Sequence, residues 1–92
     1  MKQKILNQVD QVLEDYLGKS FKTKLDNNEL RMDSDLKEEF DIGSIDLCMI
    51  MVTLEGIYHI SFDEETVARI SEATTRENIV NTIYKLISDW LM

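Results

Sequence analysis

A single serine stands at the point where a helix is expected to begin. Ser44 follows Gly43 and precedes a run of mainly apolar residues that extends to Tyr58. The first turn of a helix leaves backbone N–H groups unpaired and carries partial positive charge, so a phosphate group fits beside a serine there. Serine next to glycine is also an ordinary way to cap a helix. The position therefore has two interpretations, a phosphate-bearing serine and a simple helix cap.

Other chemistries fit the sequence less well. A Ser-His-Asp triad would combine Ser44 with His59, the one histidine, but the two are expected at opposite ends of one helix, and no Gly-x-Ser-x-Gly motif is present. An EF-hand loop counted from Asp33 would have Glu38 in place of the required glycine and Ser44 in place of the bidentate glutamate. Cys48 has neither a second cysteine nor paired metal ligands. We therefore expect no catalytic residues and no metal site.

The helix that begins at Ser44 has apolar residues on two opposite sides. At about 100° of rotation per residue, the side wide enough to face a core consists of Leu47, Ile50, Met51, Leu54, Ile57 and Tyr58. The opposite side consists of Ile45, Cys48, Met49 and Val52. A helix apolar all round is normally buried or membrane-spanning, but Asp46, Glu55 and a length under about 20 residues exclude a span. The second side is therefore expected to contact a partner surface or a bound apolar group.

The chain before Ser44 divides into a helix and a long segment without a helical repeat. The helix is expected over 2–17, with Gly18 placed to end it, and its apolar residues are Ile5, Leu6, Val9, Val12, Leu13, Tyr16 and Leu17. Over 19–40 no such repeat is found, and Asp26-Asn27-Asn28 indicates a turn. We expect a loop there, long enough to have a function or extra local turns. The residues that can hold it to the core are Phe21, Leu25, Leu30, Met32, Leu36 and Phe40.

Two helices are expected after Tyr58. The first is short, is capped by Ser61 or Asp63, and contains Val67, Ala68 and Ile70. The second follows a capping box formed by Thr74 and Glu77, and its apolar stripe consists of Ile79, Val80, Ile83, Leu86, Ile87 and Trp90. Trp90 is expected in the core or at a partly covered helix end. The whole pattern predicts one all-α domain over residues 1–92, a small four-helix bundle of three longer helices and one short helix, with the long loop between helices one and two.

Composition limits the expected partners and compartment. The 18 acidic residues outnumber the 10 basic ones and give a net charge of -8, which repels nucleic acid and anionic membranes and favours basic partner surfaces. The single cysteine cannot form an internal disulfide, and no cleavable signal segment is recognised, so a reducing cytoplasm is the expected compartment. We expect a monomer that binds neither nucleic acid nor membrane.

The order of elements around Ser44 is similar to that of a known family. The residues 43–46 read Gly-Ser-Ile-Asp; an amphipathic helix and a long acidic loop precede them, and the segment 60–65, Ile-Ser-Phe-Asp-Glu-Glu, follows the next helix. This arrangement resembles acyl carrier proteins, in which the serine of an Asp-Ser-Leu motif carries a phosphopantetheine arm. The resemblance covers nearly the whole chain and agrees in length, acidity and order of elements. It implies an acyl-carrier-like four-helix bundle.

The resemblance implies a function without catalysis. A phosphopantetheinyl transferase would move the 4′-phosphopantetheine arm from coenzyme A onto Ser44 Oγ, and the arm's thiol would carry an acyl group as a thioester. The chain would deliver acyl intermediates to acyl-transferring and acyl-modifying enzymes with basic docking patches. It would protect an apolar chain between its helices. By the same resemblance, the docking residues are Ile45, Asp46, Cys48, Met49, Val52 and Glu55.

Two departures from the family pattern bear on the pathway. Gly43 replaces the usual aspartate before the serine, and Met49 stands where fatty-acid carriers often have glutamate. The docking face is thus more apolar, which favours a dedicated carrier of a polyketide, lipid or peptide-type pathway, while the acidic loop keeps fatty-acid synthesis open. The alternatives are an aminoacyl or peptidyl carrier of a nonribosomal-peptide-like pathway and an unmodified helical protein-interaction module. The sequence names neither the acyl group nor the partner enzymes.

Overall fold

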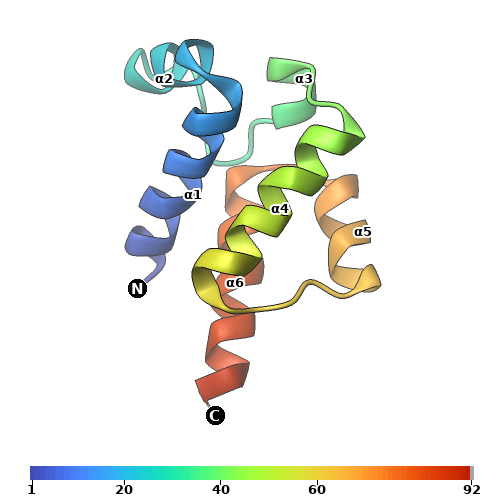
Figure 1. The fold of residues 1–92 in the computed structure, drawn as a ribbon. Coiled ribbons are helices and arrows are strands. Elements are labelled where there is room, and N and C mark those ends of the chain that lie inside the picture. The colour runs from blue at the N-terminus through green and yellow to red at the C-terminus, as the bar shows by residue number, and fades with distance from the viewer. Residues whose placement is uncertain (92) are drawn as a thin grey trace.

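The chain folds into helices joined by short links (Figure 1). This computed structural model describes residues 1–91, with the side chains of 90 and 91 left aside, so the predicted environment of Trp90 lies outside the described residues. In chain order the helices are α1 (Lys2–Leu17), α2 (Lys19–Asp26), α3 (Leu36–Phe40), α4 (Ser44–Tyr58), α5 (Glu64–Glu72) and α6 (Arg76–Leu91). No strand occurs in residues 1–91. The prediction of an all-α fold is confirmed.

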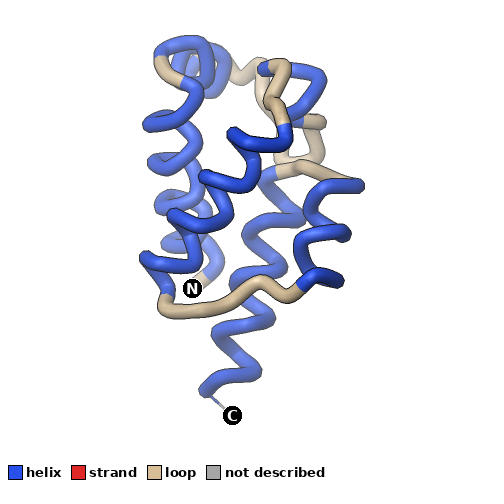
Figure 2. Tube along the Cα trace, turned by 45° about the vertical axis from the view of Figure 1, so that its right-hand side comes forward, coloured by secondary structure: helices blue, strands red, loops and turns tan. Residues whose placement is uncertain are grey.

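Three long helices, α1, α4 and α6, surround the core, and the shorter α5 lies beside α4 on the side away from α1 (Figures 1 and 2). α1 contacts both α4 and α6. The buried apolar residues of these three helices are Ile5, Val9, Val12, Leu13, Leu47, Ile50, Met51, Leu54, Ile79, Val80 and Ile83. Removing each such side chain from water stabilises the fold by roughly 1.5–3 kcal/mol. The periodic stripes of the sequence predicted these positions correctly, whereas Ile57, also predicted in the core, is 40% exposed.

The segment 19–40 is not the loop that the sequence predicted. It contains α2, of eight residues, and α3, of five. Phe21 is fully buried, and its ring centroid lies 5.6 Å from that of Phe40. Helices this short are marginal by themselves, so we attribute their stability to the burial of Phe21 and Leu36 in the core, which no local repeat reveals. Met32, predicted to contact the core, is instead 37% exposed.

The start of α6 also differs from the prediction. Thr75 is the capping residue, because its Oγ1 accepts a hydrogen bond from the Asn78 N–H at 3.0 Å. Thr74, the predicted cap, is buried and donates its hydroxyl to the Ile70 carbonyl at 2.7 Å. The predicted capping box is therefore wrong by one residue. Its glutamate, Glu77, donates its own N–H to a carbonyl of the 19–40 segment.

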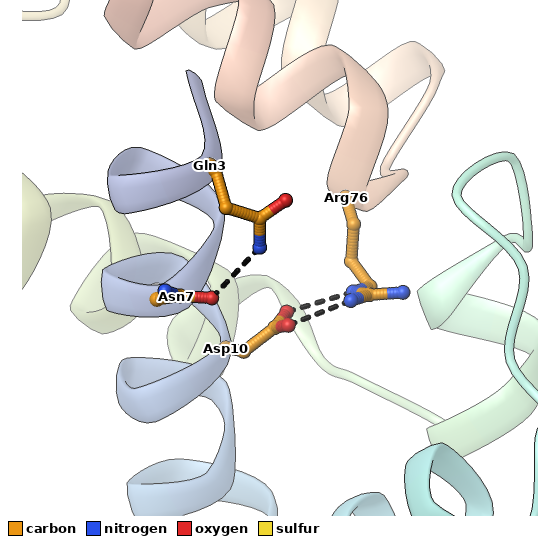
Figure 3. A network of polar contacts seen from close by, with 4 residues as sticks. All are labelled: Gln3, Asn7, Asp10 and Arg76. Atoms are coloured by element: carbon orange, nitrogen blue, oxygen red, sulfur yellow. Dashed lines mark hydrogen bonds and ion pairs between the residues drawn. The ribbon is translucent and has the colours of Figure 1, made fainter. Parts of the chain in front are cut away.

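A buried ion pair joins the first and last helices. Arg76 Nε and Nη2 donate to the two carboxylate oxygens of Asp10 at 2.7 and 2.6 Å, and Arg76 is 5% exposed (Figure 3). The bidentate geometry of the Arg76–Asp10 pair is strong and directional. A separate hydrogen bond on the surface of α1 joins Gln3, the donor, to Asn7 at 3.0 Å (Figure 3). The Arg76–Asp10 pair thus fixes the register between α1 and the start of α6.

Candidate functional site

Ser44 is the first residue of α4 and not its cap. The Leu47 N–H donates to the Gly43 carbonyl at 3.1 Å, which is the first hydrogen bond of the helix, so Gly43 occupies the capping position. Gly43 has no side chain to pair with the first-turn N–H groups. Ser44 itself is exposed. The simple-cap interpretation of Ser44 is therefore wrong, and its hydroxyl lies beside unpaired donors and the positive end of the helix dipole.

The short link between α3 and α4 sets the position of Ser44. Asp41 ends α3 in a left-handed conformation, with φ of 52°, and the next residue, Ile42, is buried in the core. Gly43 follows with an extended backbone that any residue can adopt. A Cβ built on Gly43 would lie 3.8 Å from Asp46 Oδ2, an ordinary contact. The glycine is thus not required by the backbone, although a negative side chain there would approach the Asp46 carboxylate.

A cavity of about 350 Å³ opens beside Ser44. We call it the Ser44 cavity. Its apolar lining residues include Ile42, Leu47, Met51, Val52, Phe62 and Val67, which come from α4, α5 and the links beside them. Lys37, Glu55 and Ser71 add polar groups to the lining. A cavity of this volume lies at the small end of the range for bound organic groups, and it adjoins the serine that the sequence analysis selected.

The predicted docking residues fall into two groups. Four of them, Ile45, Cys48, Met49 and Val52, form the outer side of α4; all are exposed, with Ile45 at 80% and Val52 at 53%. Asp46 is exposed near the start of the same helix. Cys48 and Val52 also line the Ser44 cavity, so the outer side and the cavity share an edge.

Glu55 lies apart from this exposed group. Its side chain is half-buried, and Oε2 accepts a hydrogen bond from the Phe62 N–H at 2.7 Å. The carboxylate therefore pins the link between α4 and α5 and contributes to the wall of the Ser44 cavity. The sequence indicated an acidic residue near the docking face but not this internal contact.

The far end of α4 carries no partner for Ser44. His59 follows the last residue of the helix in a left-handed conformation, with φ of 55°. At ~1.5 Å per residue, α4 separates His59 from Ser44 by about 20 Å, which excludes direct proton transfer between them.

Tyr58, the last residue of α4, is half-buried, and burial raises the pKa of its hydroxyl above the usual value.

Eight residues that line the cavity were not selected from the sequence as site residues: Lys37, Ile42, Gly43, Leu47, Met51, Phe62, Val67 and Ser71. Val67 was correctly predicted in the short helix and Phe62 in the link before it. Nothing in their spacing showed that they line a cavity with α4. Lys37 and Ser71 are exposed or half-buried polar residues on different helices, α3 and α5. Only the tertiary structure brings them to Ser44. Their types are common on surfaces, so the sequence carried no signal for them.

No protein-family model and no curated protein matches this chain. The described helices include none that is both long and apolar enough to cross a membrane. The resemblance to acyl carrier proteins therefore rests on the sequence features described in the sequence analysis.

Proposed function

We propose that this chain is an acyl carrier protein that works in the cytoplasm and carries acyl intermediates on a 4′-phosphopantetheine arm attached to Ser44. One observation carries the proposal: an exposed serine, at the first residue of a helix that has no side-chain hydrogen bond at its cap, adjoins an apolar-lined cavity. A catalytic serine would need a base within hydrogen-bond reach. A serine that serves as an attachment point needs access, a favourable site for phosphate and room for its cargo.

The residues around Ser44 fit a 4′-phosphopantetheine arm. Attachment would form a bond between Ser44 Oγ and the pantetheine-bearing phosphorus of coenzyme A and break the bond from that phosphorus to the bridging oxygen of the pyrophosphate. Adenosine 3′,5′-bisphosphate would leave with that oxygen, and the serine hydroxyl proton would pass to a base of the transferase. The first-turn N–H groups of α4 can then face the phosphate. When attached, the arm supplies a thiol that holds an acyl group. The chain's own role is to orient the arm and to offer the acyl group an apolar cavity away from water.

The arrangement of helices supports the same proposal. Under this proposal α1, α4 and α6 would correspond to the three longer helices of an acyl carrier and α5 to the short one, with α2 and α3 added in the connection between α1 and α4. The pathway we favour is synthesis of fatty acids, polyketides or related lipids. No feature of the cavity selects an aminoacyl or peptidyl cargo.

The outer side of α4 is the proposed docking surface for the transferase and for enzymes that use the acyl group. Ile45, Met49 and Val52 would enter apolar contacts, and Asp46 would face a basic patch on the enzyme. Exposed charge pairs contribute roughly 0–1 kcal/mol each and are screened by salt, whereas the apolar contacts are not. We therefore propose docking that keeps much of its strength at high salt. The same exposed side also supports the alternative, an unmodified helical interaction module.

Intact-mass measurement decides between a carrier and an interaction module. The protein is incubated with coenzyme A and a broad-specificity phosphopantetheinyl transferase, and we expect a gain of one phosphopantetheine. Ser44→Ala should abolish the gain. Ser71→Ala is the matched control, because Ser71 lines the same cavity and should leave labelling unchanged. No gain in the unsubstituted protein would favour the interaction module, and labelling that persists in Ser44→Ala would move the site elsewhere.

A further inference from the structure

Lys37 bridges two helices at the Ser44 cavity. It lies in the first turn of α3, and its ammonium donates a hydrogen bond to the Ser71 carbonyl near the end of α5. Lys37, Ser44 and Ser71 all line the cavity. Because Lys37 is exposed, its cation lies at the opening of the cavity and not at its floor.

The present partner of this cation is the neutral Ser71 carbonyl, although acidic residues lie nearby in the sequence and in the cavity lining. Glu39, two residues away, is paired with Lys24 at 2.8 Å. Glu55, the acid that lines the cavity, already accepts the Phe62 N–H at 2.7 Å. The ion pairs of the described residues do not include Lys37. Hydrogen bonds between charged groups are roughly twice as strong as neutral ones, so an anion at the cavity opening would compete well with the α5 carbonyl.

We propose that Lys37 is a positioning residue for the arm: its ammonium leaves the Ser71 carbonyl and pairs with the phosphodiester on Ser44. This inference rests on the proposed function. The phosphate is then held from two directions, by Lys37 of α3 and by the first-turn N–H groups of α4. Fixing the phosphate on this side directs the remainder of the arm toward the cavity and away from solvent. The same movement releases the contact between α3 and α5 at the cavity opening.

The first test uses the unsubstituted protein. Forms with and without the arm are separated by intact mass and treated briefly with acetic anhydride, and peptide mass spectrometry follows acetylation of individual lysines. We expect Lys37 to react about two- to fivefold more slowly once the arm is attached, the range for an exposed charge pair. Lys22 is the control, because it lies on α2 and does not line the cavity; its Nζ lies 3.9 Å from Asp26 Oδ2. Equal Lys37 rates in the two forms would overturn the proposal.

The second test observes the phosphate itself. In ³¹P NMR of the arm-bearing protein, the phosphodiester shift should change with sodium chloride concentration, because salt screens the pair. We expect Lys37→Met to lose this salt dependence, Lys37→Arg to keep it, and Lys22→Met to match the unsubstituted protein. A salt response that Lys37→Met leaves intact would contradict the proposal.

The two levels of inference fail differently. A protein that gains no arm mass removes the proposed function and this inference with it. A protein that gains the arm, but acetylates Lys37 equally fast in the two forms or shows a ³¹P response that does not depend on Lys37, removes the inference alone.

Discussion

The two sides of α4 have similar composition and opposite environments. On the core side, Leu47, Ile50 and Leu54 are at most 5% exposed. On the outer side, Ile45 is 80% exposed and Val52 is 53% exposed. Hydropathy alone does not distinguish these sides, because both are rich in apolar residues. The packing of α1 and α6 decides which side is covered.

This difference separates residues that hold the fold from residues available to a partner. Scattered exposed apolar residues are normal on protein surfaces, but Ile45, Met49 and Val52 lie along one side of a single helix that begins at Ser44. The core side is covered by the rest of the fold, whereas the outer side is exposed. This exposed apolar side is the one that we propose as the docking surface.

The largest expected effect tests this division directly. Leu54→Ala should lower the free energy of unfolding by ~2 to 5 kcal/mol, because Leu54 is 1% exposed and its truncation leaves a cavity in a small core. Val52→Ala, on the outer side, should change it by less than about 0.5 kcal/mol. Urea denaturation of both variants measures the difference. Equal losses would mean that the outer side is also structural, and the two sides would no longer differ in role.

Strong local repeats explain how much of the fold could be predicted. The predicted first helix, 2–17, agrees with α1 because its apolar residues recur over four turns and Gly18, with φ of 75°, ends it. The repeat in α4 gave the direction of the core but not the width of the covered side. Ile57, at the edge of that side, is exposed, while the next residue, Tyr58, packs against the core. α2 and α3 were missed because each depends on a few residues, such as Phe21 and Leu36, buried by distant parts of the chain.

The site was predictable only where its signal was local. Ser44 and the outer side of α4 could be read from consecutive residues, and the structure places them at the helix start and on the exposed side. The cavity could not be located, because its lining combines α4 with Lys37 of α3 and with Ser71 of α5, and no local pattern shows that these helices meet. The Arg76–Asp10 pair was missed for the same reason, because its members lie 66 positions apart in the sequence.

A smaller effect should separate the two acidic residues predicted for docking. Glu55→Gln should cost about 0.5–1.5 kcal/mol, because the Phe62 N–H loses a charged acceptor. Asp46→Asn should leave stability nearly unchanged, since Asp46 is exposed, but should slow labelling by the transferase at low salt. Thermal melts and labelling rates of both variants provide the measurement. If Asp46→Asn destabilises the protein as much as Glu55→Gln, Asp46 also has a structural role, and the distinction between the two acidic residues is wrong.

The starts of α4 and α5 extend the comparison to helix ends. α4 begins at Gly43, which has no side chain to bond the first turn, whereas Asp63 caps α5, its Oδ1 accepting the Thr66 N–H at 2.8 Å. This confirms Asp63 as one of the two predicted caps. A carboxylate already occupies the positive end of α5, while the corresponding end of α4 remains available to a phosphate. Of these two helix starts, only that of α5 therefore has a capping hydrogen bond that depends on an ionised carboxyl group.

The smallest expected effect is the pH dependence that this cap introduces. The hydrogen bond from the Thr66 N–H lowers the pKa of Asp63 below its usual value. A carboxyl group whose pKa is lower in the folded state stabilises the fold above the pKa of the unfolded chain, about 3.9, and loses that contribution as pH falls through the folded value. Asp63→Ser keeps a capping oxygen that does not titrate. Melting temperatures measured from pH 6 to pH 2 should therefore fall more steeply for the unsubstituted protein than for Asp63→Ser. Parallel curves of melting temperature against pH would show that the charge of Asp63 does not stabilise the start of α5. The starts of α4 and α5 would then differ in hydrogen-bond geometry alone.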